Sequence, residues 1–239
     1  MADQNGSCGI DMVRFGDSIN IILDHETYEH CSILSQYDLA LNTYRKYYQY
    51  EKITGSTRET ISLIPEEAFR EAIANALIHR TWDINSQINA AMFPDRIEIT
   101  SPGGLPEGMS EEEYIRGGIS ILRNRIIANI FFRLHLIERF GTGIRRINEF
   151  YKDSPVKPVF HLTQNAIQII LPVCYSLQVL SEDEQAVYKL LVGRSVSRSE
   201  IVEKTGFSKN KVLSILTGLE SKGYICVSGN GRGTKYTAS

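Results

Sequence analysis

The amino-acid sequence predicts an α+β protein in which a two-layer sandwich of helices and antiparallel strands precedes a small, mostly helical unit. Two observations predict this fold class. Up to residue 174, segments with the 3.6-residue apolar period of helices are interspersed with segments that have the two-residue period of strands. From residue 178 the pattern changes to three short helices and a glycine-rich hairpin. We therefore expect a leading segment over residues 1–60, a body over 61–174 and a C-terminal domain over 178–239.

The charge balance of the chain changes near the same position as the secondary-structure pattern. The formal net charge of the whole chain is −2, but residues 1–180 carry 17 basic and 22 acidic side chains, whereas residues 181–239 carry 9 basic and 6 acidic ones. A basic unit attached to an acidic body suggests an anionic partner for the basic unit. It argues against nucleic acid coating the entire protein.

Cysteine usage and hydropathy bear on the compartment. The four cysteines are scattered, without a CxxC pair or a zinc-type spacing, as is typical of reduced thiols. No apolar run approaches membrane-spanning length, and the opening "MADQNGS" is too polar for a signal peptide. We expect a cytoplasmic protein with no membrane partner.

The leading segment begins with two short strands around a turn at Gly16-Asp17. An amphipathic helix is then predicted over residues 32–52, with Tyr37, Tyr44 and Tyr48 on one packed and partly hydrated face. The polar stretch "TGSTRETISL" indicates a loop or an edge strand.

The body continues with a helix over residues 64–80, which has Pro65 and two acidic residues in its first turn. Two strands joined at Pro94-Asp95 follow, and then the glycine- and proline-rich loop "SPGGLPEGMS". Ser110 and Glu113 match a capping box. Helices are predicted over residues 123–140 and 144–151, and a final hairpin turns near residues 164–165.

One helix of the body carries polar residues at helical spacing. In "FREAIANALIHR", Glu71, Asn75 and His79 stand four apart and share a stripe, while the rest is mostly Ala, Ile and Leu. Burying such groups costs several kcal/mol unless they meet partners. The stripe is therefore a candidate functional site.

The C-terminal domain has the element order of a winged helix-turn-helix. Ser181 and Glu184 cap its first helix, Gly206 ends the second, and the third runs over residues 208–223 to Gly223. A strand, a glycine turn and another strand complete the domain. This order predicts binding of double-stranded DNA, whereas the alternative is a protein-binding module with solvated charges.

The DNA-contacting residues are expected on two elements of that domain. Residues 208–239 contain five basic residues and one acidic residue. The third helix would place its first turn in the major groove, and the hairpin would approach the backbone or the minor groove. The candidate residues are Ser208, Lys209, Asn210, Lys211, Arg232 and Lys235, with Val212, Ile215, Leu216 and Leu219 facing inward.

The glycine-rich hairpin is not a phosphate loop. The motif GxxxxGK[ST] requires the glycine to precede the lysine directly, and Thr234 intervenes between Gly233 and Lys235. The chain therefore does not match a P-loop helicase.

The body resembles a known superfamily. A helix with E-x-x-x-N, two strands, a glycine loop and a later "GTG" turn that begins a helix are similar to the GHKL ATPases. The run from "FREAIANALIHR" to "ERFGTGIRRI" looks still more like the C-terminal domain of RecG-related putative helicases or transcriptional regulators. The resemblance covers residues 60–174 and extends into the winged helix. Such proteins generally begin with a Schlafen/AlbA-type domain, so we expect that a preceding domain has been removed.

The resemblance implies roles for particular residues. Glu71 would be the catalytic base, Asn75 the ligand of Mg²⁺, and Gly141, Thr142 and Gly143 the phosphate-binding turn. Gly103 and Gly104 would belong to the loop that holds adenine. This loop departs from the D-x-G-x-G pattern, because Thr100 or Ser101 replaces the aspartate that reads adenine and Pro102 follows. ATP and Mg²⁺ are thus the cofactors that the resemblance implies, in a degenerate site.

Structural roles for the stripe stay open beside the catalytic ones. Arg145 or Arg146 could pair with the Glu71 carboxylate, and the Asn75 amide could hold the backbone of the "SPGG" loop. The function predicted is a DNA-binding transcriptional regulator whose degenerate GHKL-like domain acts as a scaffold, sensor or dimerisation unit, and a homodimer is an additional expectation. The alternative is an ATP-binding or ATP-hydrolysing protein whose nucleotide state controls the winged helix.

Overall fold

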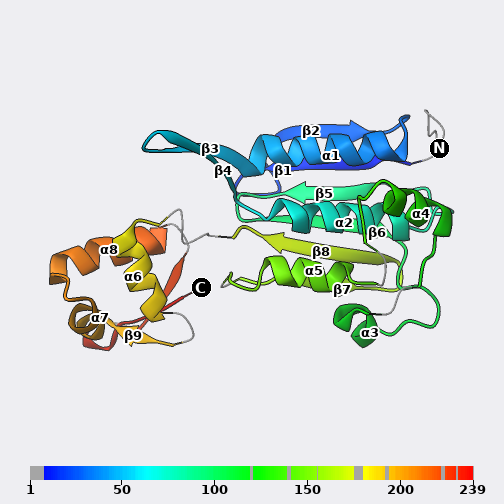
Figure 1. Ribbon diagram of the computed structural model, residues 1–239. Helices are drawn as coiled ribbons and strands as arrows, with labels where there is room; N and C mark the ends of the chain where they lie inside the picture. The colour runs from blue at the N-terminus through cyan, green and yellow to red at the C-terminus, as the bar shows by residue number, and fades with distance from the viewer. Residues whose placement is uncertain are drawn as a thin grey trace. The chain divides into compact units, whose positions relative to one another are not determined.

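The computed structural model describes residues 8–118, 121–138, 141–154, 156–174, 180–191, 194–221, 224–229 and 231–238. The chain folds into two compact units. The first consists of Met1–Asp153 with Lys157–Val173, and the second of Ser154–Val156 with Cys174–Ser239. Each unit has its own hydrophobic core, so we describe them separately (Figure 1).

The first unit is built on a six-stranded mixed sheet with the strand order β2-β1-β5-β6-β8-β7. Its strands are β1 (Ile10–Phe15), β2 (Ile22–Tyr28), β5 (Ile88–Met92), β6 (Arg96–Pro102), β7 (Val159–Leu162) and β8 (Ala166–Pro172). The expectation of a wholly antiparallel sheet is wrong at one place, because β1 and β5 are parallel. The long connection between them, with two helices and a hairpin, allows the chain to return in the same direction.

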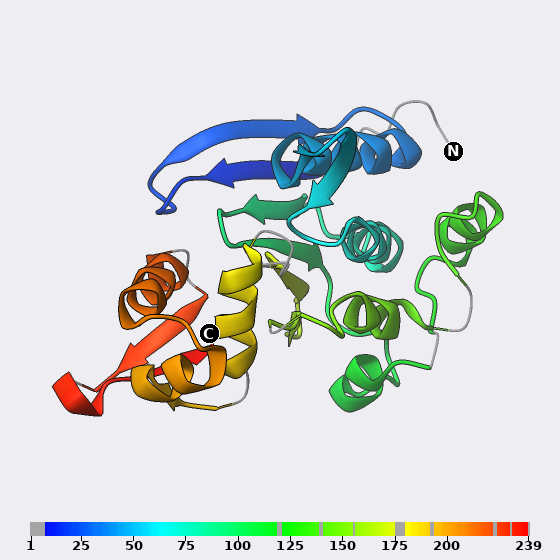
Figure 2. The ribbon, with the colours of Figure 1, turned by 60° about the vertical axis from the view of Figure 1, so that its left-hand side comes forward.

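Helices α1 (Ile33–Tyr48), α2 (Glu66–His79) and α5 (Gly143–Phe150) cover one face of this sheet (Figures 1 and 2). Strand alternation supplies the contact surface: Ile97, Ile99 and Ser101 of β6 are buried, whereas Arg96 and Glu98 are only half-buried. The first unit is therefore a two-layer α+β arrangement with α2 against the middle of the sheet.

Helix α1 begins at its Ser32 cap, whose Oγ accepts a hydrogen bond from the Ser35 N–H. It ends at Tyr48, so the prediction of helix to residue 52 is wrong. The next residues form β3 (Gln49–Thr54), which pairs with β4 (Thr57–Ser62) in a separate hairpin.

The tyrosines of α1 are drier than predicted. Tyr37, Tyr44 and Tyr48 are all buried, and the ring of Tyr44 stacks on that of Phe69 at 4.6 Å between centroids. The Tyr48 hydroxyl donates to the backbone oxygen of Phe93 at 2.7 Å. These contacts bind α1 to α2 and to the sheet.

The segment after β6 carries two shorter helices. Helix α3 (Glu111–Arg116) has the predicted capping box, with the Ser110 N–H donating to Glu113 Oε2 at 2.8 Å. Helix α4 (Arg125–Arg133) is shorter than the predicted helix over residues 123–140. His135 adopts a φ of +57°, a left-handed conformation that ends the helical path.

The second unit contains α6 (Glu182–Leu191), α7 (Arg198–Thr205) and α8 (Lys209–Ser221), with a three-stranded sheet in the order β10-β11-β9. These strands are β9 (Val196–Ser197), β10 (Ile225–Ser228) and β11 (Lys235–Ala238), and a short 3-10 turn, η2 (Gly231–Gly233), precedes β11. Strand β9 is additional to the elements that the sequence predicts. Gly206 ends α7 with a φ of +70°, as predicted, whereas Gly223 lies outside the described residues.

The described part of the chain has neither a helix that could span a membrane nor a cluster of metal-binding side chains. None of its helices combines the length and the apolar character needed to cross a bilayer. In the same residues, no group of three or more His, Cys, Asp or Glu side chains is arranged to hold a metal ion.

Candidate functional site

The polar stripe of α2 meets the beginning of α5 at Gly143. A Cβ atom built on Gly143 would stand 2.6 Å from Glu71 Oε1 and 2.7 Å from Asn75 Nδ2. With a larger residue at position 143, the Glu71 and Asn75 side chains would have to move for α5 to begin at this distance from α2. The fold therefore brings Glu71, Asn75 and the "GTG" turn together, although they are about 70 residues apart in the chain.

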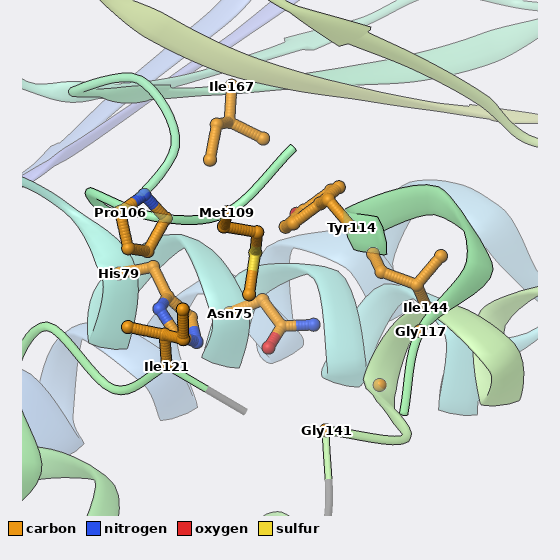
Figure 3. Close-up of a pocket in the computed structure, with 11 residues that line it drawn as sticks. Asn75, His79, Pro106, Met109, Tyr114, Gly117, Ile121, Gly141, Ile144 and Ile167 are labelled. Carbon is orange, nitrogen blue, oxygen red and sulfur yellow. The ribbon is translucent and has the colours of Figure 1, made fainter. Parts of the chain in front are cut away.

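Asn75 faces a small cavity, which we call the Asn75 cavity (Figure 3). Its volume is about 60 Å³. Asn75 and His79 of α2, Tyr114 of α3 and Ile144 of α5 line it, together with Met109 from the preceding loop. Within the described residues, no group hydrogen-bonds to the Asn75 carboxamide. Its donor and acceptor are thus available to the cavity.

The polar groups around the Asn75 cavity are uncharged at neutral pH. Burial lowers the pKa of His79 to about 4, with the positive charge of Arg123 as a second cause. Burial also raises the pKa of the Tyr114 hydroxyl. A neutral imidazole, a neutral phenol and a carboxamide therefore share a lining that is otherwise mostly apolar.

Glu71 lines a second, polar pocket with Arg70, Glu138 and Arg146, about 50 Å³ in volume. Glu71 is 7% exposed, and Arg146 Nε lies 4.0 Å from Glu71 Oε2. Burial raises the pKa of Glu71, and Arg146 and then Arg70 oppose this shift. Of the two arginines considered from sequence, Arg146 is thus the one near the carboxylate.

Arg145 and Asn75 do not make the structural contacts that were considered for them from the sequence. Arg145 Nε donates to the Arg116 backbone oxygen at 2.9 Å. Asn75 does not hold the "SPGG" loop, so that expectation is wrong. Ser101 does so instead, because its Oγ donates to the Ala76 backbone oxygen at 2.9 Å.

Gly103 and Gly104 do not line the Asn75 cavity. Gly103 has a φ of +100°, and a Cβ there would meet the Thr81 side chain and lie 2.9 Å from Arg123 Nη1. A Cβ on Gly104 would meet the Gln164 backbone oxygen. Both glycines therefore permit close packing of the loop against its neighbours, and their nucleotide role stays a prediction.

The roles of Arg123 and Asn124, which the sequence predicts as the first residues of a helix, could not be recognised from the sequence. Arg123 Nη1 donates to the His79 backbone oxygen at 2.6 Å, and Nη2 to that of Gly104 at 2.9 Å. Asn124 Nδ2 donates to the Ile78 backbone oxygen at 2.6 Å. These side chains satisfy the carbonyl groups that the end of α2 leaves unpaired. The spacing of "RNR" carries no local signal for this long-range cap.

ATP with Mg²⁺ does not fit the arrangement of these side chains. Ligand sites for molecules of that kind have volumes of roughly 300–1,000 Å³, several times that of the Asn75 cavity. None of the described side chains that line it is cationic. The carboxylate of Glu71 and the amide of Asn75 also face different pockets.

The candidate DNA-binding residues lie in the second unit. Ser208 caps α8, with the Lys211 N–H donating to its Oγ at 3.2 Å. Lys209, Asn210 and Lys235 are exposed. Lys211 is held within the unit, because its Nζ lies 2.7 Å from Asp183 Oδ2 and 4.1 Å from the centre of the Phe207 ring. The side chain of Arg232 lies outside the described residues.

Comparison with known proteins agrees with the geometry of the first unit. Residues 85–171 match the family described as "Putative ATP-dependent DNA helicase recG C-terminal". This segment includes Gly103, Gly104 and Gly141–Gly143 but not Glu71 and Asn75. The first unit thus contains a region similar to the ATPase-like RecG C-terminal domain.

Among solved structures, the chain is similar to the DIP2311 protein from Corynebacterium diphtheriae, with a TM-score of 0.64 and 17% sequence identity. The likeness covers 100% of this chain and 52% of that one, so the chain spans about half of that protein's length. At this identity the likeness shows the fold alone. No curated protein matches the chain.

Replacing Gly143 by alanine tests the contact between α2 and α5. We expect the free energy of unfolding to fall by about 2 kcal/mol, because the new methyl group would overlap Glu71 and Asn75. Combining Gly143→Ala with Asn75→Ala should recover part of this loss, since the second change makes room. Urea denaturation of the two single variants and the double variant measures the coupling. Additive losses would contradict the contact.

Proposed function

We propose that the chain is a DNA-binding transcriptional regulator. In this proposal the second unit is a winged helix-turn-helix that binds double-stranded DNA. The GHKL-like first unit serves as a scaffold, sensor or dimerisation unit. The observation that carries the proposal is the structure of α8, a capped helix that buries its apolar side within the unit and exposes Lys209 and Asn210 in its first turn.

Charge supports the same function. Five of the six charged residues over 208–239 are basic, and they lie in and after α8. Lys235 begins β11, directly after the glycine-rich turn at η2, where a wing would approach the DNA backbone. The first unit is acidic, so non-specific attraction to DNA would come chiefly from the second unit.

The Asn75 cavity supports a non-catalytic role for the first unit. Its small volume and its uncharged lining offer little to a triphosphate, and Glu71 lines a separate pocket. A homodimer is a natural addition, because two winged helices would read paired half-sites. Sedimentation velocity on the free protein and on its DNA complex measures that stoichiometry.

The proposal predicts DNA binding that weakens with salt. Lys209→Ala with Lys235→Ala should reduce the slope of log K against log salt by about 2, because each lysine would neutralise one phosphate. Fluorescence anisotropy with a random-sequence duplex measures both slopes. Lys152→Ala, an exposed lysine of the first unit, is the matched control and should leave the slope unchanged. Wild-type protein that does not bind duplex DNA at low salt would refute the proposal.

The second candidate function is ATP binding, with hydrolysis as its extension. The convergence of Glu71, Asn75 and Gly143 favours it, as does the family similarity of residues 85–171. Isothermal calorimetry with Mg²⁺ and ATP separates the two functions. We expect no binding heat, because the Asn75 cavity is too small. Measurable binding would establish the alternative, and Glu71→Ala should then stop turnover without preventing binding.

A further inference from the structure

Helix α8 has an outward stripe whose composition differs from that of its flanks. Asn210, Leu213, Ser214 and Thr217 are exposed and follow the i, i+3, i+4, i+7 spacing of one helical face. The opposite face is buried, with Val212, Ile215, Leu216 and Leu219 in the core of the second unit. This stripe is therefore the side of α8 that is not packed into the core of the second unit.

The stripe contains one carboxamide, one large apolar side chain and two hydroxyl groups, and no charge. Leu213 is 44% exposed, although it lies between buried positions at 212 and 215. The acidic residue of α8, Glu220, lies in its last turn, beyond the stripe. A surface of this kind can enter the major groove without repelling phosphate.

Lys211 has competing partners within its own unit. It pairs with Asp183 of α6 and lies over the ring of Phe207, in a contact at the surface of the unit where the Lys211 side chain is 44% exposed. The remaining cation of the first turn is Lys209, next to the stripe. Recognition of guanine is mainly the work of arginine and lysine, which the stripe lacks.

We propose that α8 reads an A·T-containing step in the major groove. Asn210 would bind adenine through its N6 and N7 atoms, the pairing for which a carboxamide has matching donor and acceptor. Leu213, one helical turn further, would contact the C5-methyl group of a nearby thymine. This inference rests on the proposed DNA-binding function and adds the bases that the site recognises.

The experiment uses modified bases to remove single atoms from the DNA. Selection from a random duplex library with the full chain first gives a consensus site. Its adenine is then replaced by 7-deazaadenine, which lacks N7, and its thymine by deoxyuridine, which lacks the methyl group. Wild-type protein should lose about tenfold in affinity at the adenine and about threefold at the thymine.

Two variants assign these losses to their side chains. Asn210→Ala should bind the adenine and 7-deazaadenine sites equally, and Leu213→Ala should not distinguish thymine from deoxyuridine. Lys235→Ala is the control, and it should lower the binding affinity for all these duplexes by a similar factor. All three substituted residues are exposed, so the variants should fold normally. An unchanged melting temperature would confirm this.

The outcomes separate the inference from the function on which it rests. Salt-dependent binding without sequence preference, or a G·C consensus that Asn210→Ala leaves unchanged, would overturn the inference and keep the function. Losses at modified bases that persist in both variants would do the same. No binding to any duplex would overturn both.

Discussion

Replacing Gly104 by alanine is expected to lower the free energy of unfolding of the first unit by about 3 kcal/mol. The new Cβ would meet the Gln164 backbone oxygen and lie 2.6 Å from that of Thr163. Both obstacles are backbone atoms of the turn between β7 and β8, so no change of rotamer can relieve the overlap. Either the loop or the hairpin must move. Urea denaturation followed by circular dichroism measures the loss.

Gly108 provides a matched control in the same loop. It has a φ of +82°, and a Cβ there would meet no atom within 4 Å. Gly108→Ala should therefore cost only the strain of a left-handed residue, about 1 kcal/mol. If Gly104→Ala were as stable as Gly108→Ala, close packing would not be the reason for glycine at position 104. A ligand-binding role for Gly104 would then regain support.

Local rules predicted most of the secondary structure. The capping boxes at Ser110 and Ser181 and the turn after β7 depend on residues within a few positions of one another, and sequence spacing reports them directly. The two-residue alternation after the turn at Pro94-Asp95 similarly predicted a strand where β6 lies. These features required no knowledge of the rest of the fold.

The failures occurred where distant segments decide the structure. The parallel pairing of β1 with β5 depends on the path of the intervening chain. Helix α4 looked longer because the apolar period of the sequence continues beyond residue 133, yet His135 ends the helical path. At the other end, Arg123 and Asn124 fit a helical pattern but donate to carbonyl groups at the end of α2. Helical periodicity cannot reveal an acceptor on another helix.

The candidate site divides in the same way. The spacing of Glu71, Asn75 and His79 correctly places them on one face of α2, and the "GTG" turn does lie against it. Their environments could not be predicted, because Glu71 and Asn75 face different pockets. Sequence spacing predicts the positions of these residues on α2, but the orientation of their side chains depends on packing against Gly143.

The stability of the first unit should fall on acidification because of His79. Its pKa is about 4 in the folded protein, below the ordinary value of 6.5, mainly because the ring is buried. The unfolded chain therefore takes up the proton first. The contribution of the neutral ring is complete above pH 6.5, and about 3 kcal/mol of it is lost as the pH falls to 4. Glu71 acts in the opposite direction, because its raised pKa makes the folded state bind its proton first.

The His79→Gln variant isolates the histidine from Glu71 and from every other titrating group. Glutamine keeps a neutral polar side chain on the Asn75 cavity but cannot be protonated in this range. Denaturation of both proteins at several values between pH 7 and pH 4 gives their difference in free energy of unfolding. This difference should shift by about 3 kcal/mol in favour of the variant at the acidic end. A constant difference would mean that the His79 ring is hydrated, and the Asn75 cavity would then be open enough to solvate a charged group.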